Sequence, residues 1–569
     1  KNQFFELLLY STYNEKAHPN RQRFRQKAVS IRVSELTSHR IRSYHCYRAF
    51  SCRLQKMFSL PVMLGILFFQ TIANAEVDFV VKIPSSKDSL RLSFASCHDF
   101  PGKYSIPTND AGVGVPFNWD LIIDREPFAF IWGGDIIYGD FPKEMQYMPY
   151  PLTVFLPDMP IFTKPFVAAS GEKLNHMYQS LKKDPGYAKL EQTLGGIGSQ
   201  RVLGTWDDHD FGLNDADKTL SIRDESKEAF LNFFDAKSND PRRFRDGVYS
   251  STLFIDENGD ESKSVLVIAL DLRYNKDPYS VKNGDFLGEK QWKWLEETLS
   301  QSKARSHVFI SSLQLLSQGK EAVTECWSDF PDKRERILKL IHDMKVKAPI
   351  IISGDVHYAE VMAANCGFSD NDDDDKDGII SNNLVGETST IVELTTSGLT
   401  HSWANGMGSF SEEMKRISAL ALEIFQTIFI WSYQTKSEGN KRDFTIDLNF
   451  GEIEFLWSNN DENNDPKVLV KILHGTDGNV LINKEYYLKD LDMENTKMNK
   501  QKNGKKATTS SSICRPQFEE PHELRQKISW IILIIIVLFL LLLKPMSWIL
   551  IGITFYRLTK NEPKKTKEN

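Results

Sequence analysis

The sequence predicts an α/β fold for the middle of the 569-residue chain, on three observations. Short apolar runs that suit strands buried on both faces alternate with segments of helical pattern. The run FAFIW at 128–132 stops at two glycines, and the carboxylate of Asp135 follows at the break. The late segments 444–457 and 467–485 are rich in β-branched and aromatic residues, which indicates antiparallel strands.

The predicted elements alternate along the chain. Strands are expected at 91–96, 128–134, 201–205, 265–270, 307–311 and 349–353. Helices are expected at 171–194, 224–236, 289–300 and 332–345.

Residues 57–75 have the outline of a secretory signal peptide. An apolar core at 60–69 is followed by Ala-Asn-Ala at 73–75, a cleavage site of the A-x-A type. We therefore expect the mature protein to begin near Glu76, and we do not expect residues 1–56 to be part of it.

The sequence predicts one membrane-spanning segment at 528–556, which is largely apolar and long enough to cross a bilayer. The basic tail 557–569 is expected in the cytoplasm by the positive-inside rule. The main domain, expected at 76–490, would then lie outside the cell or in a lumen. A flexible stalk at 491–527 would connect it to the membrane. This is the topology of a single-pass type I membrane protein.

The charge of residues 76–527 excludes nucleic acid as a partner. The segment contains 52 Lys and Arg against 71 Asp and Glu, a net charge of −19, and such a field repels a polyanion. Its cysteines are too few for a disulfide scaffold, and in an oxidising compartment Cys326 and Cys366 are candidates to pair.

Ligand-type side chains follow four of the predicted strands. They are Cys97, Asp135 with Tyr138, Asp208 with His209, and Asp355 with His357. Because sites in α/β proteins form beyond the carboxyl ends of strands, we expect these side chains to converge on one crevice. A thiolate, a phenolate, an imidazole and several carboxylates could hold a trivalent metal ion beside a divalent one. Two such ions would reverse the local field and bind a phosphoryl group.

Five motifs resemble those of the PhoD-like alkaline phosphatases: SCHD (96–99), GGDIIYGD (133–140), WDDHD (206–210), SGDVH (353–357) and ELTTSGLTHS (393–402). The GD-x-x-Y element is shared with purple acid phosphatases, in the wider calcineurin-like metallophosphoesterase superfamily. The resemblance covers about residues 78–485. It implies two facing β-sheets flanked by helices, with the metals where the sheets meet, and a metal-dependent phosphatase that uses ferric iron and calcium or other divalent ions.

The resemblance also implies roles for single residues. Cys97 and Tyr138 correspond to ligands of the first, ferric ion, and Asp135 to the carboxylate that bridges both ions. Asp208 stands where many relatives have an asparagine on the second metal, and Gln314 is a guess for the missing ligand there. Asp355 and His357 correspond to the final pair, one for each metal.

Three of these positions would form the catalytic set: Asp135, Asp208 and His209. His209 corresponds to an imidazole outside the metals that faces the leaving group. The expected substrate is a phosphate monoester, a diester or both. Within the enzyme class the alternative is a phosphodiesterase with little monoesterase activity, and outside it a degenerate ectodomain that acts as a receptor.

Plainer alternatives stay open for single residues. Cys97 alone could be a small buried hydrophobe, and Tyr138 alone a packed aromatic. Asp140, Asp207 and Asp210 could cap helices or turns, and Arg273 could form a structural ion pair or bind phosphate. The acidic run 370–377 partly matches a calcium loop but has Leu384 at the twelfth position, so a solvated acidic loop is the alternative.

Overall fold

A computed structural model describes most of the region between the two predicted membrane signals. The described residues are 77–99, 117–140, 166–196, 198–319, 325–368, 385–404, 442–457, 465–493 and 512–516, with a few residues elsewhere. The predicted signal peptide and cytoplasmic tail, and most of the predicted membrane span, lie outside them. Within the described part of the chain, no helix is both long and apolar enough to span a bilayer.

The larger of the two main sheets is mixed. In the order of hydrogen-bonded neighbours its described strands are β1 (Phe79–Ile83), β5 (Ser250–Asp256), β6 (Ser264–Ala269), β7 (Ser306–Ile310), β9 (Pro349–Ser353), β11 (Val385–Thr396), β10 (Ala359–Phe368) and β13 (Phe444–Thr445), with β17 (Ser512–Pro516) also on β10. Strands β6, β7, β9 and β11 run parallel to one another, whereas β10 is antiparallel to β11.

The second sheet joins early strands of the chain to late ones. Its order is β16 (Val480–Tyr487), β15 (Lys467–His474), β14 (Asn449–Leu456), β2 (Ser89–Ala95), β3 (Ala129–Gly133) and β4 (Val202–Thr205). Strands β2, β3 and β4 are parallel, and the late strands pair antiparallel as their composition predicts. Because β2, β3 and β4 point the same way, the residues that follow them reach the same edge of the sheet.

The strands that carry the site are buried on both faces, which explains their unbroken apolar sequence. In β3, Ala129 and Ile131 belong to the core between the two sheets, whereas Phe130 and Trp132 face a separate core on the outer side. In β9, Ile350 and Ile352 lie in the same central core and Ile351 points outward. The predicted arrangement of two facing sheets is therefore confirmed.

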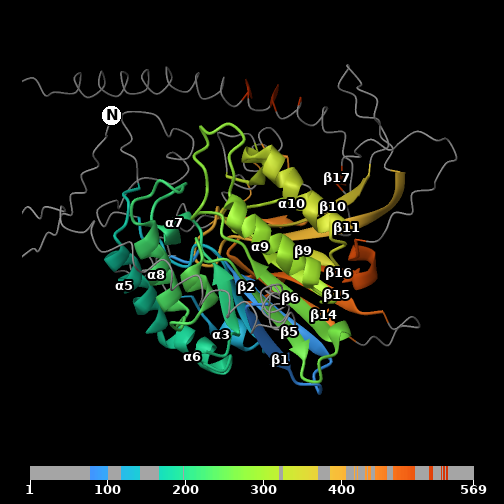
Figure 1. Ribbon diagram of the computed structural model, residues 1–569, viewed down its shortest axis with the longest axis horizontal. Helices are drawn as coiled ribbons and strands as arrows, with labels where there is room; N and C mark the ends of the chain where they lie inside the picture. The colour runs from blue at the N-terminus through green and yellow to red at the C-terminus, as the bar shows by residue number, and fades with distance from the viewer. Residues whose placement is uncertain are drawn as a thin grey trace, which may run out of the picture. The chain divides into compact units, whose positions relative to one another are not determined.

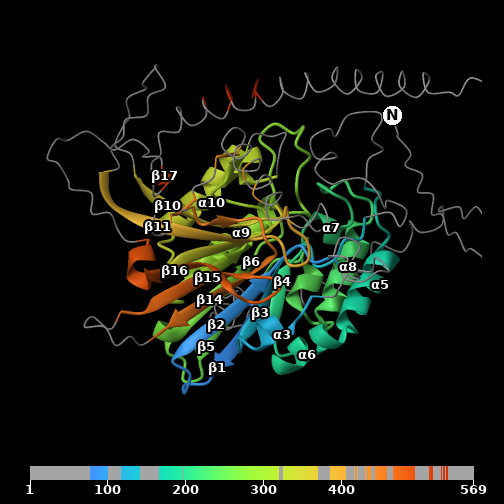
Figure 2. The ribbon, with the colours of Figure 1, turned by 180° about the vertical axis from the view of Figure 1, so that it is seen from behind.

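Helices cover the outer face of each sheet (Figures 1 and 2). On the larger sheet, α9 (Gly288–Gln301) and α10 (Pro331–Asp343) bury an apolar stripe that includes Trp292 and Ile341. On the smaller sheet the covering helices are α3 (Asp120–Ile123), α5 (Gly171–Lys182), α6 (Pro185–Thr193) and α8 (Arg223–Phe233).

The single helix predicted at 171–194 is instead two helices, α5 and α6. The second begins at Pro185, which suits the first position of a helix, and the side chain of Asp184 accepts a hydrogen bond from the amide of Tyr187 as its N-cap. The remaining short elements are α7 (Asp208–Phe211), η1 (Pro241–Phe244), η2 (Glu261–Lys263), η3 (Trp327–Asp329), η5 (Leu488–Leu491) and the two-stranded pair of β8 (Gln318–Gly319) with β12 (Ile430–Trp431).

Two predictions about the end of the domain need correction. The folded domain extends past residue 490, because the apolar side chains of Leu491 and Met493 are buried in its cores. The segment predicted as a flexible stalk also contains β17, which pairs with the edge of β10 from Ala364 to Phe368. Backbone hydrogen bonding at a sheet edge does not depend on side-chain type, so the polar composition of this segment concealed the strand.

Cys326 and Cys366, the candidates to pair, do not form a disulfide with each other. Cys326 is a buried thiol outside any disulfide and lies close to the hydroxyl of Ser328, with 2.8 Å between Sγ and Oγ. Cys366 is disulfide-bonded, and the strand register places the backbone of Cys514 in β17 directly opposite it. The partner of Cys366 therefore depends on a strand that the sequence did not reveal.

Candidate metal centre

Side chains from three strand ends surround the carboxylate of Asp135. The thiol of Cys97, which follows β2, lies 3.6 Å from its Oδ2 atom. The hydroxyl of Tyr138 lies 3.3 Å from the same oxygen and 3.1 Å from Nε2 of His357, which follows β9. All four side chains are buried. The structure thus brings together four of the six predicted metal ligands.

Asp135 also belongs to a second group of potential ligands. Its carboxylate lies within 4.8 Å of ligand atoms of Asp208 and His209, and Asp208 in turn meets Asp207 and Asp355. These residues follow β3, β4 and β9, which come from both sheets. Asp135 therefore occupies the shared position between the two groups, as a bridging carboxylate would.

The backbone is left-handed at four of these positions. The φ angles are 58° at Cys97, 50° at Asp135, 69° at Asp355 and 57° at His357. Residues with a side chain rarely adopt this conformation, and it costs about 1–3 kcal/mol each time. The fold holds these strand ends in a strained form that turns the four side chains toward one centre.

The electrostatics of the buried groups favour a bound cation. Burial, followed by the carboxylates of Asp208 and Asp207, raises the pKa of Asp135 well above its usual range. Burial, with the carboxylates of Asp207 and Asp208, does the same to Asp355. Among the described residues, Oδ1 of Asp135 and Oδ2 of Asp207 are buried and have no hydrogen-bond partner. Such crowded, unpaired carboxylate oxygens fit a multivalent metal ion.

His357 is prepared to bind a metal because its ring is neutral. Burial, together with the positive charge of His209, lowers the pKa of His357 to about 3. Its backbone amide donates a hydrogen bond of 2.6 Å to the hydroxyl of Ser397. A neutral imidazole is the form that coordinates metals.

The sequence matches the model of the PhoD-like phosphatase family over residues 92–413. The chain belongs to this family. Two solved structures are similar: "Structure of PhoD" (14% identity, 73% of this chain and 71% of that chain covered, TM-score 0.42) and the purple acid phosphatase PPD1 from seeds of yellow lupin, Lupinus luteus (13% identity, 72% and 56% covered, TM-score 0.37). A comparison with curated proteins gave no match.

Membership of the PhoD-like phosphatase family makes the chain a metal-dependent phosphoesterase. The family model spans four of the strand ends described above, from Cys97 to His357. The buried groups of His, Cys and Asp side chains at these ends fit the divalent metal use that the family implies.

His209 of this PhoD-like chain pairs with a buried carboxylate. Its Nδ1 atom lies 2.8 Å from Oδ1 of Asp140, and the other oxygen of Asp140 accepts a hydrogen bond from the amide of Asn214. Burial opposes a charge on the ring, but the carboxylates of Asp140 and Asp208 raise the pKa of His209 to about 10. Asp140, which could have been a simple cap, therefore keeps His209 protonated at neutral pH.

Asp207 and Asp210 have structural partners. Asp210 accepts hydrogen bonds from the amides of Ile136 and Ile137 and from the hydroxyl of Tyr178. It therefore fixes the loop that carries Asp135. Asp207 caps α7 and also accepts a hydrogen bond from Arg273.

The amide of Gln314 is engaged elsewhere. Its Nε2 atom donates to Oε1 of Glu360 at 2.7 Å and to the hydroxyl of Thr395 at 2.9 Å. A metal ion would bind the other amide atom, Oε1, so these hydrogen bonds leave Gln314 as a guess for a ligand. The acidic run at 370–377, which partly matches a calcium loop, lies outside the described residues.

Two residues beside the centre received no role from the sequence. The hydroxyl of Ser397 lies 3.0 Å from the thiol of Cys97. The ring of His401 lies 4.4 Å from that of His357 and 4.8 Å from that of Tyr138, measured between ring centroids. Both belong to the motif at 393–402, and the resemblance of that motif to the PhoD-like phosphatases was the only available signal.

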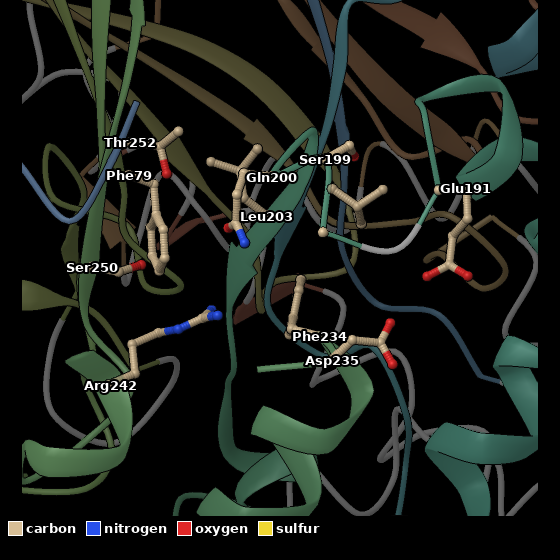
Figure 3. Close-up of a pocket in the computed structure, with 13 residues that line it drawn as sticks. Phe79, Glu191, Ser199, Gln200, Leu203, Phe234, Asp235, Arg242, Ser250 and Thr252 are labelled. Atoms are coloured by element: carbon tan, nitrogen blue, oxygen red, sulfur yellow. The ribbon is translucent and has the colours of Figure 1, made fainter. Parts of the chain in front are cut away.

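A separate pocket, drawn in Figure 3, shares no residue with this centre. Its walls include Phe79, Glu191, Asp235 and Arg242, and its cavity volume is about 30 Å³. That volume suits a few water molecules rather than a substrate.

Proposed function

We propose that the chain hydrolyses phosphate esters at a two-metal centre. The six proposed ligands are Cys97, Asp135, Tyr138, Asp208, Asp355 and His357. The observation that carries the proposal is the convergence of a thiol, a phenol and an imidazole on one buried carboxylate, Asp135, whose second oxygen has no partner among the described residues.

The donor atoms support ferric iron beside calcium. A thiolate and a phenolate with an imidazole suit a transition metal at the position of Cys97, Tyr138 and His357. The carboxylates of Asp208 and Asp355 suit a hard ion such as calcium. Bound metals would supply positive charge for the phosphoryl oxygens and lower the pKa of a water molecule.

His209 is the proposed general acid. Its Nδ1–H donates to the carboxylate of Asp140, so Nε2 is the nitrogen that passes its proton to the departing alkoxide. The Asp140 carboxylate holds the ring in this orientation and stabilises its charged form. Leaving groups of high basicity depend most on such a donor.

Metal analysis of the purified full chain tests the centre directly. We expect bound iron and calcium in the wild type, and Asp135→Asn should lower metal content and activity in parallel. Asp240→Asn is the matched control, since Asp240 is also buried but pairs with Arg242 beside the pocket of Figure 3. Folded wild-type protein without any tightly bound transition metal would refute the proposal.

Substrate preference needs a direct comparison of rates. We propose hydrolysis of phosphate monoesters, diesters or both, because a two-metal centre serves either class. Rates on an aryl phosphate and on its bis-aryl diester separate these outcomes. A rate confined to the diester would establish the phosphodiesterase alternative.

We also propose that the enzyme is anchored to a membrane through 528–556, with the catalytic domain outside the cell or in a lumen. The apolar length of this segment and the basic tail behind it support the proposal. A chain that ends at residue 520 should be released from the membrane with full activity. Membrane association of that truncated chain would contradict the assignment of 528–556 as the anchor.

A further inference from the structure

The guanidinium of Arg273 is completely buried beside the candidate metal centre. It lies beyond β6 and donates to two carboxylates, from Nε to Asp207 at 2.5 Å and from Nη1 to Glu325 at 2.6 Å. Its third nitrogen, Nη2, is also buried and has no hydrogen-bond partner among the described residues. A buried charged donor without a partner is costly, so this atom points to a ligand that the centre binds.

The carboxylates of Asp207 and Glu325 do not occupy all the hydrogen-bond donors of the Arg273 guanidinium. Glu325 also accepts from the ammonium of Lys276 and from the hydroxyl of Tyr279. The same oxygen of Asp207 that binds Arg273 accepts a hydrogen bond of 2.9 Å from Ser312. Arg273 and Lys276 together balance Asp207 and Glu325, and Nη2 has donor capacity left over.

The position of Nη2 follows from the planar shape of the guanidinium. Nη2 lies between Nε and Nη1 on the donor edge, so its N–H groups point into the space between Asp207 and Glu325. Asp208 is the residue common to the ligand group with Asp207 and to the group with Glu325. Ligand atoms of Asp207 and Glu325, the two partners of Arg273, lie within 4.8 Å of ligand atoms of Asp208, so the guanidinium lies beside the position where Asp208 and Asp355 would hold the second metal.

We infer that Nη2 of Arg273 binds a phosphoryl oxygen of the substrate at the second metal position. This inference rests on the proposed function and adds a substrate-binding residue to it. A guanidinium matches phosphate oxygens in geometry and charge better than an ammonium does. Arg273 would then bind the phosphoryl group through Nη2, while Nε and Nη1 hold Asp207 and Glu325 in place.

Replacement of Arg273 by lysine tests the inference. Arg273→Lys keeps the positive charge but removes the donor fork. We expect the KM for an aryl phosphate and the inhibition constant of inorganic phosphate both to rise about 10- to 100-fold, the effect of one lost hydrogen bond to a charged group. Metal content should stay at the wild-type level.

Arg242→Lys is the matched control. Arg242 is also buried and donates from Nε and Nη2 to Asp240, but it lies at the pocket of Figure 3, where its guanidinium covers the ring of Phe79. This variant loses a buried donor fork without touching the centre, so both constants should match the wild type. Unchanged phosphate inhibition in metal-loaded Arg273→Lys would overturn the inference and leave the proposed function intact.

A structure of the wild-type protein with inorganic phosphate removes any dependence on the folding of the variants. We expect a phosphate oxygen within hydrogen-bond distance of Nη2 of Arg273, about 2.7–3.2 Å. A water molecule at Nη2, with phosphate bound elsewhere, would make Arg273 a structural ion pair only. Wild-type protein that lacks metal and activity would instead contradict the proposed function itself.

Discussion

At the scale of single residues, the hydrogen bond between His209 and Asp140 determines which ring proton of His209 can be transferred to a leaving group. Nδ1 of His209 is engaged by the carboxylate, and the pKa of the ring is raised to about 10. The imidazole is therefore charged across the neutral range. The same ring packs against that of Tyr138 at an interplanar angle of 35°, with 4.2 Å between centroids, which restricts its orientation beside the centre.

We predict that His209→Asn keeps its metals but loses about 10²–10⁴-fold in rate, the usual contribution of general acid catalysis. The loss should be largest with alkyl phosphates and smaller with aryl phosphates, whose leaving groups need less protonation. Metal content and kcat on both substrate types provide the measurement. Loss of metal would make His209 a ligand, and full activity on alkyl phosphates would place the acid elsewhere.

Gly134 permits the sharp turn that presents Asp135. Its φ angle is 109°, and a Cβ atom there would lie 2.8 Å from the Cβ of Asp207. We predict that Gly134→Ala lowers activity by more than about tenfold, because the collision displaces Asp207 or Asp135. Gly259→Ala is the control, with a φ of 83° but open space around the added atom. Equal activity of the two variants would contradict this reasoning.

At the scale of elements, burial of whole strands places polar groups where they affect stability. His307 lies in β7, and its ring nitrogens contact the carbonyl of Lys347 and the hydroxyl of Ser302. Burial lowers the pKa of His307 to about 4. Since the unfolded chain has a pKa near 6.5 for histidine, protonation favours unfolding between these two values.

We predict that stability is lost as the pH falls from about 6.5 toward 4, partly through His307. Between pH 7 and pH 5 this residue should lower the free energy of unfolding by about 2 kcal/mol, at about 1.4 kcal/mol per unit. His307→Gln removes the titrating group. Between pH 7 and pH 5, the free energy of unfolding of this variant should therefore fall by about 2 kcal/mol less than that of the wild type. Urea unfolding at the two pH values makes the comparison. An identical pH dependence in both proteins would refute the role of His307.

At the scale of the whole molecule, the candidate centre joins the two sheets. Cys97, Asp135 and Asp208 follow strands of the smaller sheet, whereas Asp355 and His357 follow β9 of the larger sheet. The contact is close, since a Cβ atom at Gly354 would lie 2.5 Å from the hydroxyl of Ser96. Metals held here would connect both halves of the core.

We predict that removal of the metals destabilises the domain as well as inactivating it. A ligand present at 1,000 times its Kd stabilises the folded state by about 4 kcal/mol, so a chelator should lower the Tm by several degrees. The shift should be much smaller in Asp135→Asn, which holds less metal at the start. Calorimetry with and without chelator measures it, and an unchanged wild-type Tm would contradict a metal that bridges the sheets.

The sequence alone determined the four strands that lead into the centre, most helices and the six candidate metal ligands that meet there. Strands buried on both faces are unbroken apolar runs, and side chains such as Asp135 and His357 stand directly after them. This pattern can be recognised in the sequence because each ligand directly follows its own strand. The parallel strands then bring these ligands together at one edge. The motifs therefore identified the family before any geometry was available.

Only the tertiary structure decided which groups pair. Asp140 with His209, Arg273 with Glu325, and Ser397 with Cys97 are each separated by more than 50 positions along the chain. Such contacts depend on the order of strands in both sheets, which local sequence patterns do not encode. The strand β17 opposite Cys366 was hidden for the same reason, since the hydrogen bonds of a sheet edge carry no side-chain signature.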